Sequence, residues 1–211
     1  MDLYRILPFP HLVEIFEKKE LSLSCPKSWD DPYESLIAEK YLSLIFAQCW
    51  CTVSLSDALW RIYSPDRLSV RIRTTESRLR AQVRAGLSDP NRFQLEIGKV
   101  NYDSTKEVQK ATQRQLSQYK KSRKENDLLA SLLFKRNAYK HESEYRVVVF
   151  DKQADRNQVR LPVPINPHEL ISSVLADPRA ADETVDVLSF YLKKKLKFKG
   201  PVNKSRLNEK P

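Results

Sequence analysis

Hydrophobic and polar residues follow two different periods along this chain. Alternation over short runs is typical of strands, and apolar residues three or four apart are typical of helices. The pattern predicts strands at residues 2–7, 21–24, 47–55, 68–74, 92–102, 145–150, 158–165 and 170–177. It predicts helices at residues 11–20, 56–64, 76–86, 104–139 and 181–195, and a further helix that begins at Asp31.

The order of these elements predicts an α+β fold. Strands and helices do not alternate regularly, and several strands gather late in the chain, which disfavours a parallel sheet of βαβ units. We expect a single domain at residues 1–195, with a mostly antiparallel sheet, in one piece or split, and flanking helices. Residues 196–211 are basic and rich in Asn, Ser and Pro, so we expect a mobile tail there.

Composition excludes several classes of protein. The chain has only three glycines, so no glycine-rich loop of the Rossmann or P-loop type can be assembled. The three histidines are scattered, which leaves zinc without a ligand set. No apolar run approaches the roughly 20 residues of a membrane-spanning helix. With three cysteines and no secretory signal, we expect a cytoplasmic protein.

Positive charge is concentrated in two regions. The formal net charge is +10. Residues 193–211 carry eight Lys or Arg and one Glu, and residues 99–124 carry eight Lys or Arg and two acids. Each region is either an ordinary solvated surface or a surface for a polyanion such as nucleic acid.

The stretch KHESEYRVVVF, residues 140–150, places charged side chains where a buried strand begins. If the strand extends back to Glu142, then Glu142, Glu144 and Arg146 share one face, because strand side chains alternate. Carboxylates are rarely buried without a partner. This face therefore lines a cleft, or Arg146 and Glu144 form a structural ion pair.

Four short motifs follow one another along the chain: Leu-Tyr-Arg at 3–5, Asp-Asp-Pro-Tyr-Glu at 30–34, Trp-Arg-Ile-Tyr at 60–63 and Glu-Ser-Glu-Tyr-Arg at 142–146. In this order they resemble a widespread uncharacterised bacterial domain family over roughly residues 3–176. The family has Asn where this chain has Asp30, Phe in place of Tyr33 and Tyr in place of Ile6. The second motif also fits a helix N-terminus, with Asp31 as the cap and Glu34 in the capping box.

The layout is also similar to that of the ADP-ribosyltransferase superfamily. Those enzymes carry an Arg or His on the first strand, a Ser-Thr-Ser or aromatic element on a second strand and a Glu-x-Glu on a later strand. The resemblance implies these site residues: Tyr4 and Arg5 on the first strand, Thr52 and Ser54 as the second element, and Glu142 and Glu144 as the Glu-x-Glu. The second element here reads Thr-Val-Ser and is an incomplete match.

The implied chemistry is cleavage of NAD at its nicotinamide bond, which builds positive charge on the ribose. An ionised Glu144 would stabilise that charge, and Glu142 would orient or deprotonate the acceptor. Arg5 would hold ribose or diphosphate oxygens, or it is an ordinary exposed strand residue. Ser54 would support Glu144 by a hydrogen bond.

Trp60 and Tyr63 stand three residues apart on a predicted helix, so they lie on one side of it. They would stack on the nicotinamide or adenine ring of NAD, or they belong to the core.

We therefore expect an ADP-ribosyltransferase-like enzyme that acts on nucleic acid, with RNA favoured over single-stranded DNA, as a bacterial toxin or antiphage effector. A toxic enzyme also implies a neutralising protein, an antitoxin. One alternative is a nucleic-acid-binding module without activity. Another is a metal-dependent nuclease that uses Asp30, Asp31, Glu34 and Glu144, although adjacent aspartates seldom face one ion.

Overall fold

The computed structural model describes residues 1–29, 31–35 and 39–208. Their contacts divide the chain into two compact units. Unit 1 comprises Met1–Leu21, Cys51–Gly86 and Pro164–Pro211, and unit 2 comprises Ser22–Trp50 and Leu87–Val163. Neither unit is a continuous segment, so no single cut in the chain separates them. The single domain at residues 1–195 stays a prediction.

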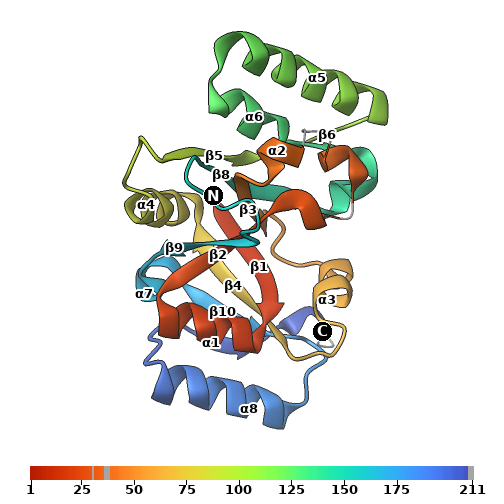
Figure 1. Cartoon of the computed structure of the whole chain (residues 1–211). Helices are drawn as coiled ribbons and strands as arrows, with labels where there is room; N and C mark the ends of the chain where they lie inside the picture. Colours follow the sequence, from red (N-terminus) through yellow and green to blue (C-terminus); the bar gives the residue numbers. More distant parts are fainter. Residues whose placement is uncertain (30, 36–38, 209–211) are drawn as a thin grey trace. The chain divides into compact units, whose positions relative to one another are not determined.

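Unit 1 contains a sheet whose strands lie in the order β11 (Val202–Lys204), β10 (Ser173–Ala176), β4 (Ser69–Thr75) and β1 (Asp2–Pro8) (Figure 1). β1 and β4 are antiparallel along their whole length, from Asp2 opposite Thr75 to Pro8 opposite Ser69. β4 and β10 are also antiparallel, whereas β10 and β11 are parallel.

The helical segments of unit 1 are α1 (Phe9–Lys18), α3 (Asp57–Tyr63), α4 (Glu76–Gly86), α7 (Pro167–Leu170), α8 (Asp182–Phe190), its continuation η4 (Tyr191–Lys195) and the short η5 (Arg206–Asn208). α1 buries Leu12, Ile15 and Phe16, the spacing of one helix face. α3 has an N-terminal cap, because the Ser56 hydroxyl accepts a hydrogen bond from the Leu59 amide at 3.2 Å.

Most of the strands of unit 2 are antiparallel. β8 (Glu144–Asp151) pairs with β5 (Phe93–Lys99) over seven residue pairs and also with β3 (Ile45–Cys51). β3 pairs with β2 (Glu20–Ser24), which is followed in the sheet by β9 (Arg160–Pro164). The short β6 (Asn101–Asp103) and β7 (Phe134–Arg136) form a parallel pair. The predicted α+β class with a mostly antiparallel sheet is confirmed.

The helical segments of unit 2 are η1 (Pro26–Ser28), η2 (Pro32–Ser35), α2 (Glu39–Leu42), α5 (Thr105–Ser122), α6 (Glu125–Ser131) and η3 (Asn137–Glu142). Leu128, Leu129 and Leu132 are fully buried and pack against Val148 and Phe150 of β8. These three leucines therefore belong to the core of unit 2. These contacts fix the strand that carries Glu144 and Arg146.

Two predicted elements have different bounds in the structure. The strand predicted at 47–55 ends at Cys51, so Thr52 and Ser54 follow the strand instead of lying on it. The single helix predicted at 104–139 is instead two helices, α5 and α6, because Arg123 adopts a left-handed conformation that ends α5. The helical part stops at Ser131, since residues 134–136 pair with β6 and tertiary pairing overrides the local helical pattern. The helix predicted from Asp31 is observed as η2 and α2, and its residues 36–38 lie outside the described part.

The segment predicted as a tail, residues 196–211, contributes to unit 1. β11 pairs with β10, and the Phe198 side chain is only 3% exposed. Alternating lysines hid these few inward positions from the sequence pattern. Mobility of the segment stays a prediction. Within the described residues, no helix is both long and apolar enough to cross a bilayer.

Candidate functional site

Five ionisable side chains from four elements of unit 2 meet in a carboxylate–cation cluster, which consists of Glu34, Lys135, Glu142, Glu144 and Arg146. Glu34 comes from η2, Lys135 from β7 and Glu142 from the end of η3, while Glu144 and Arg146 lie two residues apart on β8. Four of the five side chains are buried, and that of Glu142 is 14% exposed.

Arg146 holds Glu144 through two hydrogen bonds. Its Nε donates to Oε2 at 2.6 Å, and its Nη2 donates to Oε1 at 3.0 Å. The guanidinium also donates to the Leu132 carbonyl at 2.7 Å, forms an ion pair with Glu34 and lies 4.4 Å from the Trp29 ring centre. The ion pair between Arg146 and Glu144 that the sequence left open is therefore present, and Arg146 is 1% exposed.

Lys135 joins the two glutamates that the sequence put forward. Its ammonium group donates to Glu142 Oε2 and to Glu144 Oε1, both at 2.6 Å, and lies 3.7 Å from Glu34 Oε2. Glu142 is not on the strand, because Ser143 adopts a left-handed conformation, with φ of 45°, between η3 and β8. The two carboxylates thus share Lys135, although they do not extend one strand.

The pKa values of the two glutamates shift in opposite directions. Burial, with a hydrogen bond to Glu144, raises the pKa of Glu142 to about 7 despite the nearby Lys135. Burial would also raise the pKa of Glu144, but the charge and hydrogen bonds of Arg146 hold it well below its usual range. Glu144 is therefore ionised throughout the neutral range, whereas Glu142 exchanges a proton close to pH 7.

The number of charges in the cluster explains why one of its carboxyl groups holds a proton. Three carboxylates face two cations, and burial also raises the pKa of Glu34. Burial would lower the pKa of Lys135, but Glu144 and Glu34 raise it above its ordinary value, so Lys135 stays charged. With Glu142 or Glu34 protonated, the cluster is neutral, which is the favourable state for a buried group of charges.

Tyr102 and Cys49 are neighbours of the cluster and interact with Glu144. The Tyr102 hydroxyl accepts a hydrogen bond from the Glu144 amide at 2.8 Å, which fixes the start of β8. Burial and the charge of Glu144 raise the pKa of the Cys49 thiol to about 12, so Cys49 is no thiolate nucleophile at neutral pH.

The carboxylates of the nuclease alternative are engaged by cations. Asp31 forms an ion pair with Arg136 at 2.9 Å and accepts from the Tyr33 amide at 3.0 Å, as a helix cap does. Glu34 and Glu144 pair with Arg146, and Asp30 lies outside the described residues. In the part of the chain that the structure describes, no three His, Cys, Asp or Glu side chains are placed to hold a metal ion.

In unit 1, the register of β1 and β4 separates Tyr4 from Arg5. Residues directly opposite each other in an antiparallel pair share a face, and Arg5 stands opposite Ile72. Tyr4 lies on the other face, which it shares with Arg71, whose guanidinium carbon is 4.7 Å from the Tyr4 ring centre. Tyr4 and Arg5 therefore do not contact one ligand from the same side of this sheet.

Arg71 is a residue that the sequence analysis missed. It is 9% exposed, and among the described residues its buried Nε has no hydrogen-bond partner. Burial lowers its pKa from the ordinary arginine value. A buried guanidinium with an open donor is unusual, because each unsatisfied buried donor costs stability. The alternation in the stretch SVRIRT gave no signal that this arginine turns inward.

The remaining predicted NAD contacts differ in accessibility. Trp60 is 1% exposed and its carbonyl accepts from Arg179 at 3.1 Å, so it has the core role that the sequence left open. Tyr63 is 46% exposed, Ser54 is exposed and Thr52 is half-buried. These three residues stay predicted contacts.

The predicted catalytic glutamates belong to unit 2, whereas Tyr4, Arg5, Thr52, Ser54, Trp60 and Tyr63 belong to unit 1. Their convergence on one NAD molecule stays a prediction.

Residues 59–147 match the model of a family described as "Protein of unknown function (DUF2971)". The match includes the Trp-x-x-Tyr and Glu-x-Glu-Tyr-Arg motifs, and it agrees with the predicted likeness to an uncharacterised family. Comparison with curated proteins gave no match.

Comparison with solved structures found similarity to DarT from Thermus sp. 2.9. The complex with carba-NAD+ has a TM-score of 0.45 and 12% identity, over 97% of this chain and 95% of that chain. The complex with ADP-ribosylated ssDNA has a TM-score of 0.46 and 12% identity, over 98% of this chain and 94% of that chain.

Proposed function

We propose that this protein is an ADP-ribosyltransferase-like enzyme that cleaves NAD and transfers ADP-ribose to a nucleic acid. The observation that carries the proposal is the pair of glutamates with opposite pKa shifts, joined by Lys135 at 2.6 Å from each. Adjacent carboxyl groups whose pKa values are pushed apart are typical of sites where one group stays charged and the other moves a proton.

The two glutamates would have separate roles. Glu144 would supply the negative charge that stabilises the oxocarbenium-like ribose, since Arg146 and Lys135 keep it ionised and fixed. Glu142, with a pKa of about 7 and a side chain that is 14% exposed, would take the proton from the acceptor. Lys135 would position both carboxylates.

Of the predicted NAD contacts in unit 1, Tyr4, Thr52, Ser54 and Tyr63 would be kept. Arg5 lies on the opposite face of β1 from Tyr4, so it would contact NAD only in place of Tyr4. We add Arg71, because an open buried Nε beside the Tyr4 ring can donate to a diphosphate oxygen. Arg71 and Arg5 lie on opposite faces of the β1–β4 pair, so a ligand that touches Tyr4 would be held by Arg71.

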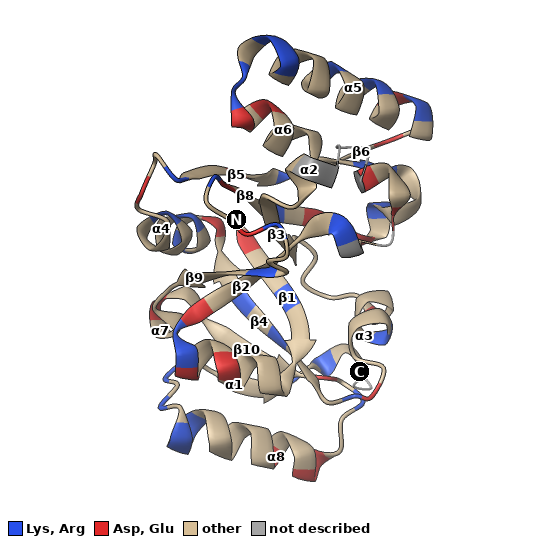
Figure 2. Ribbon diagram, in the orientation of Figure 1, with Lys and Arg blue, Asp and Glu red and all other residues tan. Residues whose placement is uncertain are grey.

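The acceptor would be a nucleic acid, with RNA favoured and single-stranded DNA as the alternative. Helix α5 carries Lys and Arg along its length (Figure 2), and its exposed cations are Lys106, Lys110, Arg114, Lys120 and Lys121. A basic helix of this kind attracts a phosphate backbone without reading sequence. An enzyme with this activity in the cytoplasm would act as a toxin or antiphage effector and would require a neutralising protein.

The test is incubation of the purified protein with labelled NAD and either RNA or single-stranded DNA. We expect label on one nucleic acid, and a loss of about 100-fold or more in transfer rate for Glu142→Gln, since general base catalysis contributes roughly that much. Glu125→Gln is the matched control, because it removes a carboxylate of unit 2 that lies outside the cluster and forms a 3.6 Å ion pair with Lys152. Glu142→Gln transfer at the wild-type rate would contradict the proposal.

A nucleic-acid-binding module without activity is the second candidate, and the charge of α5 favours it. It predicts salt-sensitive binding by the wild-type protein with no transfer of label from NAD. Magnesium-dependent cleavage of the nucleic acid would instead indicate the nuclease.

A further inference from the structure

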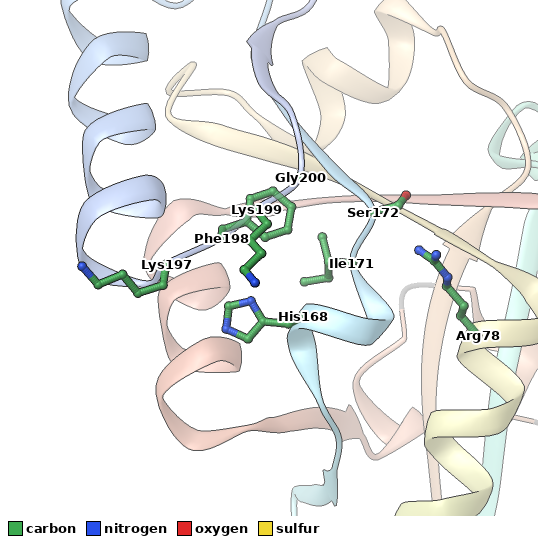
Figure 3. A pocket seen from close by; sticks show the side chains of 8 residues that line it. All are labelled: Arg78, His168, Ile171, Ser172, Lys197, Phe198, Lys199 and Gly200. Carbon is green, nitrogen blue, oxygen red and sulfur yellow. The ribbon is translucent and has the colours of Figure 1, made fainter.

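Unit 1 contains a pocket with basic walls, formed by three segments that are distant in sequence. Arg78 comes from α4, His168 from α7, and Lys197, Phe198 and Lys199 from the segment between η4 and β11. Figure 3 shows the Lys199 side chain directed toward the His168 ring beside Phe198. The cavity measures about 650 Å³, within the roughly 300–1,000 Å³ that small-molecule sites occupy.

The floor of this basic pocket is held by packing. Phe198 and His168 both lie edge-on to Phe16 of α1, with ring centres 5.7 Å and 5.1 Å away. The Phe198 amide donates to the Leu192 carbonyl at 2.9 Å. Gly200 closes the segment, because a Cβ there would lie 2.5 Å from the Ser172 carbonyl oxygen and 2.5 Å from the Phe198 ring. The lysines therefore project from a fixed backbone.

The positive charge of this pocket is not neutralised by any residue that the structure describes. Within the described residues, no ion pair joins Arg78, Lys197 or Lys199 to a carboxylate, and no acidic side chain lines the cavity. The nearby Glu169 is engaged by Gln82 and Asn166, at 2.8 Å and 2.9 Å. In Figure 3 the Lys199 ammonium group lies beside His168, the Lys197 side chain is directed away from them, and Arg78 lies beyond Ile171 and Ser172. Cations around one concave site without counter-charges raise the local potential for an anion.

We propose that this basic pocket binds a phosphate monoester of nucleotide size, either a free nucleoside monophosphate or the 5′-phosphate end of a nucleic-acid strand. A monoester dianion matches several cations better than the single charge of a backbone phosphodiester, and charge-assisted hydrogen bonds from Arg and Lys suit its oxygens. The apolar floor and the volume suit an attached sugar or base, for which inorganic phosphate alone would be too small.

Binding is measured without NAD, so the outcome does not depend on transfer activity. The probes are AMP, adenosine, inorganic phosphate, and one labelled oligonucleotide with either a 5′-phosphate or a 5′-hydroxyl. We expect AMP or the 5′-phosphorylated strand to bind about tenfold more tightly than adenosine or the 5′-hydroxyl strand. The Lys197→Ala/Lys199→Ala variant should lose this preference, as should Arg78→Ala.

Matched controls remove the same charge from neighbouring positions. The control for the double lysine variant is Lys194→Ala/Lys195→Ala, which changes two exposed residues of η4. The control for Arg78→Ala is Arg84→Ala, which changes an exposed residue of α4. None of these residues lines the pocket. These controls should keep the phosphate preference. Equal weakening by controls and pocket variants, no preference for the phosphate group, or binding of inorganic phosphate without gain for AMP or the strand would overturn the proposal. If AMP binds and the phosphorylated strand does not, the ligand is a free nucleotide. If only the strand binds, the ligand is the 5′ end of a nucleic acid.

Discussion

The carboxylate–cation cluster of unit 2 and the basic pocket of unit 1 differ in whether their cations are paired with carboxylates. In the cluster, Lys135 and Arg146 are buried and each contacts carboxylates directly. In the pocket, Arg78, Lys197 and Lys199 are exposed, and among the described residues none pairs with an acid. The carboxylates of the cluster neutralise its cations, whereas the cations of the pocket would be neutralised by a bound anion.

An unpaired cation lowers stability much more when it is buried than when it is exposed. A buried cation without a partner destabilises the fold by several kcal/mol, so cluster residues must be satisfied within the chain. An exposed cation is solvated and screened, so it can remain without a partner until an anion arrives. Substitutions in the cluster should therefore change stability first, and substitutions in the pocket should change binding first.

The largest expected effect is that of Arg146→Met. It leaves Glu34 and Glu144 buried without their main cation and should lower the free energy of unfolding by about 3–5 kcal/mol. Urea unfolding at pH 7 measures it. Removing the exposed charge of the pocket by Lys197→Met is the matched control and should cost less than about 0.5 kcal/mol.

A double variant makes this prediction sharper. Adding Glu144→Gln to Arg146→Met removes one of the abandoned charges, so the pair should be less destabilising than the sum of the single changes. Strict additivity would mean that the two residues do not stabilise each other, and Arg146 would then act mainly through its packing on Trp29.

Gly200→Ala comes next and tests whether the pocket has a fixed backbone. The added methyl group meets the Ser172 carbonyl and Phe198, so we expect a loss of about 1–3 kcal/mol through overpacking. Thermal unfolding measures the loss. Gly86→Ala, at the last residue of α4, is the comparison and should be far milder, because alanine favours a helix. Equal effects would mean that the close approach at Gly200 is easily relieved.

Glu142→Gln should change how stability depends on pH. The folded-state pKa of about 7 lies above the ordinary value of 4.5, so Glu142 contributes stability at low pH that is lost as pH rises through 7. Gln cannot ionise, so the variant should gain on the wild type between pH 5 and pH 8, by about 1 kcal/mol after allowance for solvent screening. Urea unfolding of both proteins at pH 5 and pH 8 measures this difference in the free energy of unfolding. A variant that loses stability relative to the wild type between these pH values would mean that the proton is not on Glu142.

The cluster was only partly predictable from the sequence. The pairing of Glu144 with Arg146 follows from their two-residue spacing on one strand, and the Glu-x-Glu motif marked Glu142. Lys135 was hidden because it lies inside a charged stretch with a helical period, and its strand forms only by pairing with distant β6. Local pattern cannot show such pairing, because its energy comes from tertiary contacts.

The pocket was less predictable still. Its cations are spread over α4 and the segment before β11, with His168 of α7 beside them, and the sequence shows the segment before β11 only as a run of lysines. Phe198 and Gly200 were the available signals, since an aromatic and a glycine within a basic tail suggest an ordered segment. The parallel pairing of β11 with β10 spans 28 residues, from Val174 to Val202, which no short-range pattern reveals.

The smallest expected effect is that of Lys199→Ala on stability, and its small size is what distinguishes the pocket from the cluster. Removing one of several like charges relieves repulsion, so the free energy of unfolding should stay within about 0.5 kcal/mol of the wild type. Any gain should appear at low salt and fade at about 0.15 M salt, because screening weakens repulsion between exposed charges. A loss well above 1 kcal/mol would mean that Lys199 already has a structural partner, and the contrast between the two regions would no longer hold.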